Sequence, residues 1–188
     1  NKEKLKELED VKKKADDALL EIERLKRELA KSKSDADQLR LTKAYNKETD
    51  ALSATDWFTK GYNAYENKEY DKAISFYLRA IELDPDDDAA YNNLGVAYKN
   101  QGNLTKAIQS YEKAIEIDPD YAKAYNNLGV VYLEQGNLTK AIQLYEKAIE
   151  LDPDLAQAYN NLGVAYKNQG NLTKAIQSYE KAIELDPD

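Results

Sequence analysis

Glycine and proline recur in this chain at a fixed interval of 34 residues. The first series is Gly61, Gly95, Gly129 and Gly163, and the second is Pro85, Pro119, Pro153 and Pro187. A third series has Gly102, Gly136 and Gly170, with Lys68 at the matching place in the first unit. A fixed period in this range is typical of a repeat array, whose units cannot bury their apolar faces alone. The sequence therefore predicts stacked units that share one continuous core.

Each unit predicts a pair of helices. Tyr91, Leu94 and Tyr98 share one helical face, because their spacing is i, i+3 and i+7. Gly102 then ends the first helix, and Asn103 is a suitable N-cap for the second. The apolar stripe of the second helix is Leu104, Ala107, Ile108, Tyr111, Ala114 and Ile115. The helix is expected to stop before Pro119, because proline disfavours helix in the residue that precedes it.

These positions resemble the tetratricopeptide repeat family. In the second unit the matching residues are Tyr91, Leu94, Gly95, Tyr98, Ala107, Tyr111, Ala114 and Pro119. The third and fourth units repeat this pattern, and the first departs from it at Lys60 and Ala64. The resemblance implies an all-α fold: a right-handed superhelical solenoid of antiparallel helix pairs. Its four repeats would span residues 54–87, 88–121, 122–155 and 156–188.

Residues 1–52 contain neither Gly nor Pro and predict a long helical arm. Apolar residues at alternating intervals of three and four form the seam of a coiled coil, which is Leu8, Val11, Ala15, Ala18, Ile22, Leu25 and Leu29. Two early seam positions are alanine, so the seam is thin there. The segment 32–37 predicts a break between two helices. Two interpretations stay open: the arm self-associates or clasps a partner helix, or it folds against the first repeat as a long cap.

The boundary between the arm, 1–52, and the repeat domain, 53–188, is marked by the sequence SATD at 53–56. Ser53 and Asp56 have the spacing of a capping box, in which each side chain satisfies a backbone amide at the start of a helix. Just inside this boundary, Phe58 and Tyr62 lie off the repeat's packing stripe. They are expected either to form an apolar pocket at one end of a groove or to pack under the arm.

Composition excludes several function classes. The net charge is −8, and residues 53–188 carry 22 acidic and 13 basic residues. Such an array repels a phosphate backbone, so we expect no nucleic-acid partner. The chain has no His and no Cys, which removes the commonest general base, metal ligand and thiol nucleophile. We therefore predict no enzyme, no cofactor and no metal site, and we interpret the acidic run at 83–90 as a solvated turn that caps the next helix.

The chain has no apolar run near the ~20 residues that a membrane span needs. Its first residues, NKEKLKELED, have no apolar core of a signal peptide. We therefore expect no membrane span, and a cytoplasmic location is favoured.

In the tetratricopeptide family, the first helix of each repeat lines the concave side of the superhelix. The family's groove positions 5, 6, 9 and 12 give the candidate peptide-binding residues here, which are Asn92, Asn93, Val96, Lys99, Asn126, Asn127, Val130, Leu133, Asn160, Asn161, Val164 and Lys167. The carboxylate clamp of chaperone co-factors needs Lys at position 5 and Asn at position 9. This sequence has Asn and Val at those positions, so that activity is not implied.

The position 6 residues Asn93, Asn127 and Asn161 are similar to the asparagine ladder of the O-linked N-acetylglucosamine transferase repeats, in which the amide holds peptide backbone. An amide offers donors and an acceptor, which match both polar groups of an extended peptide unit. The alternative is that these side chains form hydrogen bonds within the array or face water.

The resemblance implies a protein–protein interaction scaffold that binds an extended or helical peptide segment of a partner in the groove. The alternative is a structural module that forms a homo-oligomer, through residues 1–52 or through the uncapped C-terminal repeat. A third interpretation is an engineered consensus-like protein without a native ligand, because residues 91–116 and 159–184 are identical.

Overall fold

The computed structural model of the chain describes residues 2–31 and 35–187, where all regular secondary structure is α-helical. The helices are α1 Lys2–Lys31, α2 Asp35–Asp50, α3 Ala54–Glu66, α4 Tyr70–Leu83, α5 Asp88–Gln101, α6 Leu104–Ile117, α7 Ala122–Glu134, α8 Leu138–Leu151, α9 Ala156–Gln169 and α10 Leu172–Leu185. The backbone separates into two compact units, Asn1–Trp57 and Phe58–Asp188. The predicted all-α fold is confirmed.

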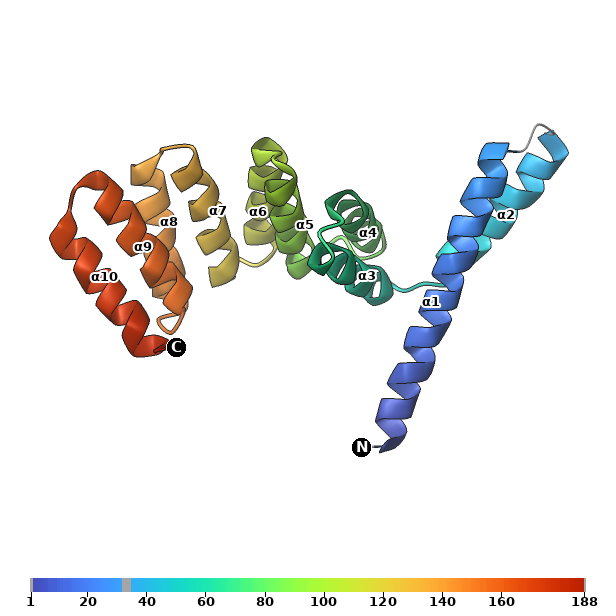
Figure 1. Cartoon of the computed structure of the whole chain (residues 1–188), viewed down its shortest axis with the longest axis horizontal. Helices are drawn as coiled ribbons and strands as arrows, with labels where there is room; N and C mark the ends of the chain where they lie inside the picture. The colour runs from blue at the N-terminus through green and yellow to red at the C-terminus, as the bar shows by residue number, and fades with distance from the viewer. Residues whose placement is uncertain (1, 32–34, 188) are drawn as a thin grey trace. The chain divides into compact units, whose positions relative to one another are not determined.

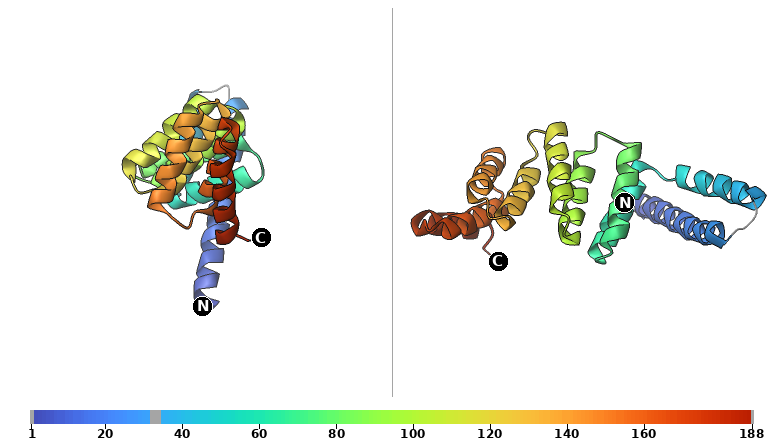
Figure 2. Two further views of the ribbon diagram at one scale, coloured as in Figure 1. Left: turned by 90° about the vertical axis from the view of Figure 1, so that its left-hand side faces the viewer. Right: turned by 90° about the horizontal axis from the view of Figure 1, so that it is seen from above.

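In the first unit, α1 packs along α2, as two views show (Figures 1 and 2). Ile22 and Leu25 of the predicted seam are buried, so the seam is used within this unit. An open hollow lies beside Ala15 and Ala18, where it is also lined by Leu52. The thin part of the seam therefore leaves space that larger side chains would fill. The side chains of Leu8 and Val11, and residues 32–34 of the predicted break, lie outside the described part of the chain.

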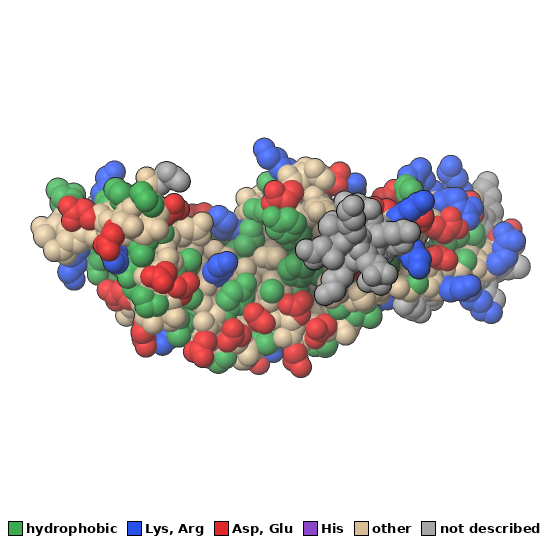
Figure 3. All heavy atoms as spheres, turned by 90° about the horizontal axis from the view of Figure 1, so that it is seen from below, with side chains coloured by type: hydrophobic (Ala, Val, Ile, Leu, Met, Phe, Trp, Pro, Cys, Tyr) green, Lys and Arg blue, Asp and Glu red, His purple; other side chains and the backbone are tan. Residues whose placement is uncertain are grey.

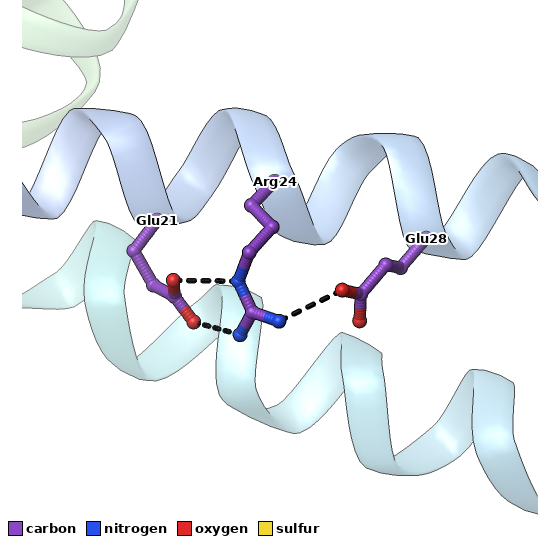
Figure 4. Close-up of polar contacts among 3 residues, drawn as sticks. All are labelled: Glu21, Arg24 and Glu28. Carbon is purple, nitrogen blue, oxygen red and sulfur yellow. Dashed lines mark hydrogen bonds and ion pairs between the residues drawn. The ribbon is translucent and has the colours of Figure 1, made fainter.

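Charged side chains one helical turn apart form hydrogen bonds and ion pairs along the exposed surface of α1. Arg24 donates from Nε to Glu21 at 2.8 Å and from Nη1 to Glu28 at 2.7 Å, and its Nη2 also contacts Glu21 (Figure 4). The hydrogen bond from Arg24 lowers the pKa of the Glu21 carboxyl. These pairs are exposed, so they support the helix locally and contribute little to the stability of the fold.

The second unit is a series of antiparallel helix pairs that follow one another from α3–α4 to α9–α10 (Figure 1). The predicted helix ends are confirmed. Gly102 ends α5 in the left-handed region with φ 88°, and Asn103 accepts a hydrogen bond from the Lys106 amide at 3.1 Å. At the start of α3, Ser53 and Asp56 bond each other's backbone amides at 2.9 and 3.1 Å, which is the predicted capping box.

In each repeat, the ring of one tyrosine in the second helix packs directly against one glycine in the first helix. The side chains of Tyr77, Tyr111 and Tyr145 are fully buried. A Cβ atom built on Gly95 would lie 2.6 Å from Cε1 of Tyr111, and the other repeats have similar distances. Glycine at this position is therefore required by the ring that packs over it. Phe58 contacts the tyrosine of the first repeat, since its ring packs edge-on against Tyr77 with the ring centroids 5.7 Å apart.

Candidate protein-binding groove

A chain of side-chain amides runs through the first helices of the repeats. Asn161 donates to Asn126 Oδ1 at 2.9 Å, and Asn127 donates to Asn92 Oδ1 at 3.0 Å. Within the second and third repeats, the first asparagine donates to the second, from Asn92 to Asn93 at 3.4 Å and from Asn126 to Asn127 at 3.5 Å. The doubled asparagine therefore has a division of roles. Position 5 accepts from the next repeat, and position 6 donates to the preceding one.

The amide chain ends differently at the first repeat, because position 5 there is Phe58 and offers no acceptor. Asn93 instead forms its hydrogen bond with the Tyr77 hydroxyl. The hydroxyls of Tyr111 and Tyr145 occupy the equivalent place in the next two repeats and have no partner. Burial raises the pKa of both phenols. The amides that would reach them have bonded to the asparagines of the preceding repeat.

The amides of the chain differ in accessibility. Asn92 and Asn126 are buried, while Asn93, Asn127 and Asn161 are partly exposed. A primary amide has two N–H donors and an oxygen with two lone pairs. Asn127 uses one donor and one lone pair within the array, so one of each remains for another molecule. Asn160 is exposed and has no hydrogen-bond partner in the part of the chain that is described.

An apolar row lies one helical turn beyond the amides. Val96, Val130 and Val164 are partly exposed at position 9 of the three regular repeats, and Leu133 is partly exposed at position 12. Position 9 of the first repeat is Tyr62, which is half exposed. In the three regular repeats, the row therefore presents one aliphatic side chain beside one amide. This is the pattern that a regular backbone with alternating side chains would match.

Polar side chains at positions 12 and 13 connect neighbouring repeats. Lys99 lies 3.5 Å from Glu134, and Asn100 donates to the Tyr65 hydroxyl at 3.2 Å. The third repeat has Glu134 at the position where the second repeat has Asn100. Glu134 thereby supplies the carboxylate that Lys99 of the second repeat contacts. Lys167 is exposed and has no repeat after it to provide such a partner among the described residues.

Sequence reasoning alone did not identify Tyr65 and Tyr77 as partners of these amides. Their signal is the irregularity of the first repeat, where Phe58 replaces the acceptor asparagine and Tyr65 replaces Lys99 at position 12. Since a repeat contacts its neighbours through equivalent positions, a change at one position redirects the side chain that faces it from the next repeat.

Acidic side chains are spread over the face drawn in Figure 3. Within 2–31 and 35–187, no cluster of acidic residues has the arrangement of a metal site. The predicted turn at 83–90 is confirmed, since Asp87 caps α5 by accepting from the Ala90 amide at 2.9 Å. None of the described helices has the length and apolar character to cross a membrane.

Comparison with known proteins identifies the repeats. The family described as "Tetratricopeptide repeat" matches residues 86–154 and 120–188, and a second family, "TPR repeat", matches residues 61–102. No protein among the curated sequences compared with the chain matches it significantly.

Solved structures support the same assignment. The crystal structure of MamA is 27% identical with a TM-score of 0.66, and the match covers 83% of this chain and 97% of that one. The first TPR of Spaghetti (RPAP3), bound to the HSP90 peptide SRMEEVD, is 25% identical with a TM-score of 0.60, over 63% and 94% of the two chains. PilF of Pseudomonas aeruginosa is 24% identical with a TM-score of 0.67, over 71% and 61%, and shows the fold alone. The chain belongs to the tetratricopeptide repeat family, whose members are protein-interaction scaffolds.

Proposed function

We propose that this chain binds an extended or helical segment of a partner protein in the groove lined by α5, α7 and α9. The observation that carries the proposal is the repeated register of amide and aliphatic side chains. Asn93, Asn127 and Asn161 each keep hydrogen-bonding capacity, and a partly exposed valine lies one turn away in the same helix.

The register supports recognition of backbone with a preference for apolar side chains. Each position 6 amide retains a donor, and at Asn127 also a lone pair, for one peptide unit of a ligand. Val96, Val130 and Val164 would contact the ligand's side chains. The neighbour in complex with SRMEEVD supports binding of a peptide segment by this fold. That particular peptide is not the expected ligand, because this chain has no Lys at position 5 and no Asn at position 9.

The test selects ligands from a phage-displayed library of random linear peptides on the full chain and measures affinity by fluorescence anisotropy. We expect Val130→Lys to weaken the selected peptides by about tenfold or more, because a charge replaces an apolar contact. Leu78→Lys is the matched control, since Leu78 is already exposed on α4. Equal affinity of the Val130→Lys and Leu78→Lys variants for every selected peptide would reject the groove. SRMEEVD is the negative control peptide.

The ladder itself is tested by replacing Asn93, Asn127 and Asn161 with alanine together. These amides also bond within the array, so affinity must be compared with the unfolding midpoint of the same variant. A loss of affinity that exceeds the shift expected from the lower fraction of folded protein supports contact with the ligand backbone. Unchanged affinity would show that the amides serve the array alone.

Self-assembly stays a second candidate, and one observation favours it. Leu172, Ile176 and Ile183 are exposed on α10, which gives this helix an apolar surface. The arm is a weaker route to a homo-oligomer, because Ile22 and Leu25 of its seam are already buried in the first unit. Sedimentation at increasing concentration would detect association through either part.

A further inference from the structure

A small hollow lies on the surface of the second repeat, apart from the candidate groove. We call it the Tyr98 hollow, and its lining residues are Tyr91, Tyr98, Lys106, Gln109 and Ser110. Its volume is about 250 Å³, which gives room for one side chain of another molecule. None of the five lining residues is a candidate groove residue, so the hollow is a separate surface.

The fourth repeat contains the same five residues, because residues 159–184 are identical to residues 91–116. There the hydroxyl of Tyr166, which matches Tyr98, donates a hydrogen bond to Oε1 of Glu146 at 2.9 Å. Glu146 belongs to α8 of the preceding repeat. Burial and the Glu146 carboxylate raise the pKa of the Tyr166 phenol, which therefore keeps the proton that it donates.

The residue that would supply this carboxylate to the second repeat is a leucine. Helix α4 packs on α5 as α8 packs on α9, and Leu78 of α4 stands at the position that Glu146 has two repeats later. A leucine side chain cannot accept a hydrogen bond. The Tyr98 hydroxyl accordingly has no hydrogen-bond partner in the part of the chain that is described. The second repeat thus has the phenol of the fourth without its carboxylate.

The third repeat satisfies its phenol in another way. The Tyr132 hydroxyl accepts from Nζ of Lys140 at 2.7 Å, and this ammonium group lies 4.1 Å from the ring centroid. Leu144 takes the place of Ser110 and packs partly buried against the neighbouring core cluster. The third repeat therefore uses its own lysine for the phenol and has a larger side chain where the second repeat has a hydroxyl. An unsatisfied phenol is not a general property of the repeat.

The groups around the Tyr98 hollow match a carboxylate on an apolar stem. Nζ of Lys106 lies 5.3 Å from the centroid of the Tyr98 ring, so a cation stands beside the phenol. The Ser110 hydroxyl donates to the Lys106 carbonyl at 2.8 Å, which leaves the phenol, the ammonium group and the Gln109 amide as donors. Donors of this kind bind a carboxylate strongly, and the rings of Tyr91 and Tyr98 offer apolar walls to methylene groups.

We propose that the Tyr98 hollow binds a glutamate side chain of a partner protein, in the role that Glu146 has in the fourth repeat. The partner's carboxylate accepts from the Tyr98 hydroxyl and faces the Lys106 ammonium group, and its methylene groups lie against the two rings. An exposed pair of charges contributes little affinity, so this glutamate fixes the register of a larger contact. The site goes beyond the groove function, and either can fail without the other.

The test follows the tyrosine rings of the full chain by NMR with carbon-13-labelled tyrosine. The probe is N-acetyl-glutamic acid N-methylamide, whose only charge is the side-chain carboxylate, and the matched control is its glutamine counterpart. We expect saturable shifts of the Tyr98 signals in the millimolar range with the glutamate probe alone. The Tyr166 signals should not respond, because Glu146 already accepts from that hydroxyl. Tyr98→Phe and Tyr166→Phe identify the two sets of signals.

Two exchanges between the repeats should give opposite results. Leu78→Glu supplies the second repeat with a carboxylate of its own and should remove the response of Tyr98. Glu146→Leu removes the carboxylate from the fourth repeat, so Tyr166 should begin to respond with a similar affinity. Both side chains are exposed, so these substitutions leave the fold intact.

The cation is tested by Lys106→Gln, which should weaken binding at Tyr98 by about threefold or more. Its matched control is Lys174→Gln, the same change in the fourth repeat, which should leave the Tyr98 response as it is. The proposal is overturned by the absence of a saturable shift at Tyr98 or by an equal shift with the glutamine probe. It is overturned equally by a Tyr98 response that survives Leu78→Glu, or by a Tyr166 that stays silent after Glu146→Leu.

Discussion

The second and fourth repeats have the same 26 residues in different surroundings. Tyr111 is fully buried in the second repeat, whereas Tyr179 at the same position in the fourth is partly exposed. Ala114 is buried and Ala182 is partly exposed, and Asn92 is buried while Asn160 is exposed. The only covering element that the second repeat has and the fourth lacks among the described residues is a following helix pair.

This difference shows that a repeat's burial comes from its neighbour as much as from its own sequence. Local features are equal in the two copies, since Asn103 and Asn171 both cap their helices and Gly102 and Gly170 both end theirs. What changes is the apolar area removed from water on the far side of the pair. Stability should therefore fall toward the uncovered end, as expected for a nearest-neighbour array.

The largest expected contrast is between Tyr111→Ala and Tyr179→Ala. Removing a fully buried ring leaves a cavity, and we expect Tyr111→Ala to lower the free energy of unfolding by about 4 kcal/mol. Tyr179 buries less area, so its removal should cost about 2 kcal/mol. Urea unfolding followed by circular dichroism measures both. Equal losses would mean that the following repeat contributes nothing to the burial of the ring.

Glycine under the ring gives a second contrast. Alanine at Gly95 or Gly163 would place Cβ 2.6 Å from a tyrosine Cε1 atom in either repeat. Tyr111 is enclosed and cannot move away, so Gly95→Ala should destabilise by about 2 kcal/mol even after the gain in helix propensity. Tyr179 can shift toward solvent, and Gly163→Ala should change stability by less than about 1 kcal/mol. Thermal unfolding of the two variants compares them, and a larger loss for Gly163→Ala would contradict this account.

The amide chain predicts that Asn92→Ala and Asn160→Ala change the free energy of unfolding in opposite directions. Asn92→Ala removes the acceptor of Asn127 from a buried site and should destabilise by about 1 kcal/mol. Asn160→Ala removes no hydrogen bond within the described array, and alanine is the better helix former, so we expect a gain of about 0.5 kcal/mol. The two variants differ in one position of an identical sequence, which makes each the control for the other. Destabilisation by both would indicate a role for Asn160 within its own repeat.

Much of the fold follows from the sequence because its signals are local and repeated. Asn103, Gly102 and the capping box of Ser53 and Asp56 act over one helical turn, and the structure has each as predicted. The surface against which the arm's apolar seam packs was harder to predict. A seam such as Ile22 and Leu25 specifies an apolar partner surface, and α2, a second copy and the first repeat all satisfy that requirement by pattern alone.

The sequence predicts which positions line the candidate groove, but it does not predict which hydrogen bonds their side chains form. The sequence places Asn93, Asn127 and Asn161 at one register, yet an amide bonds whichever partner lies nearest. For Asn127 that partner is Asn92, and for Asn93 it is Tyr77, because Phe58 replaces the acceptor. Each choice depends on the side chain at position 5 of the preceding repeat, 35 residues away, which a single repeat does not reveal. The assignment of the groove to a ligand stays a prediction.

The smallest contrast concerns a single oxygen atom. The Tyr111 hydroxyl is buried without a partner, because Asn127 donates to Asn92 instead. Tyr111→Phe removes an unsatisfied polar group and should stabilise the chain by about 0.5 kcal/mol, while Tyr179→Phe at the partly exposed end should have no measurable effect. Tyr77→Phe should destabilise by a similar amount, since Asn93 would lose its hydrogen bond. Thermal midpoints of the three variants, measured side by side, test this order. If Tyr111→Phe destabilised as Tyr77→Phe does, the hydroxyl would have a partner, and Asn127 would have to divide its donors between Tyr111 and Asn92.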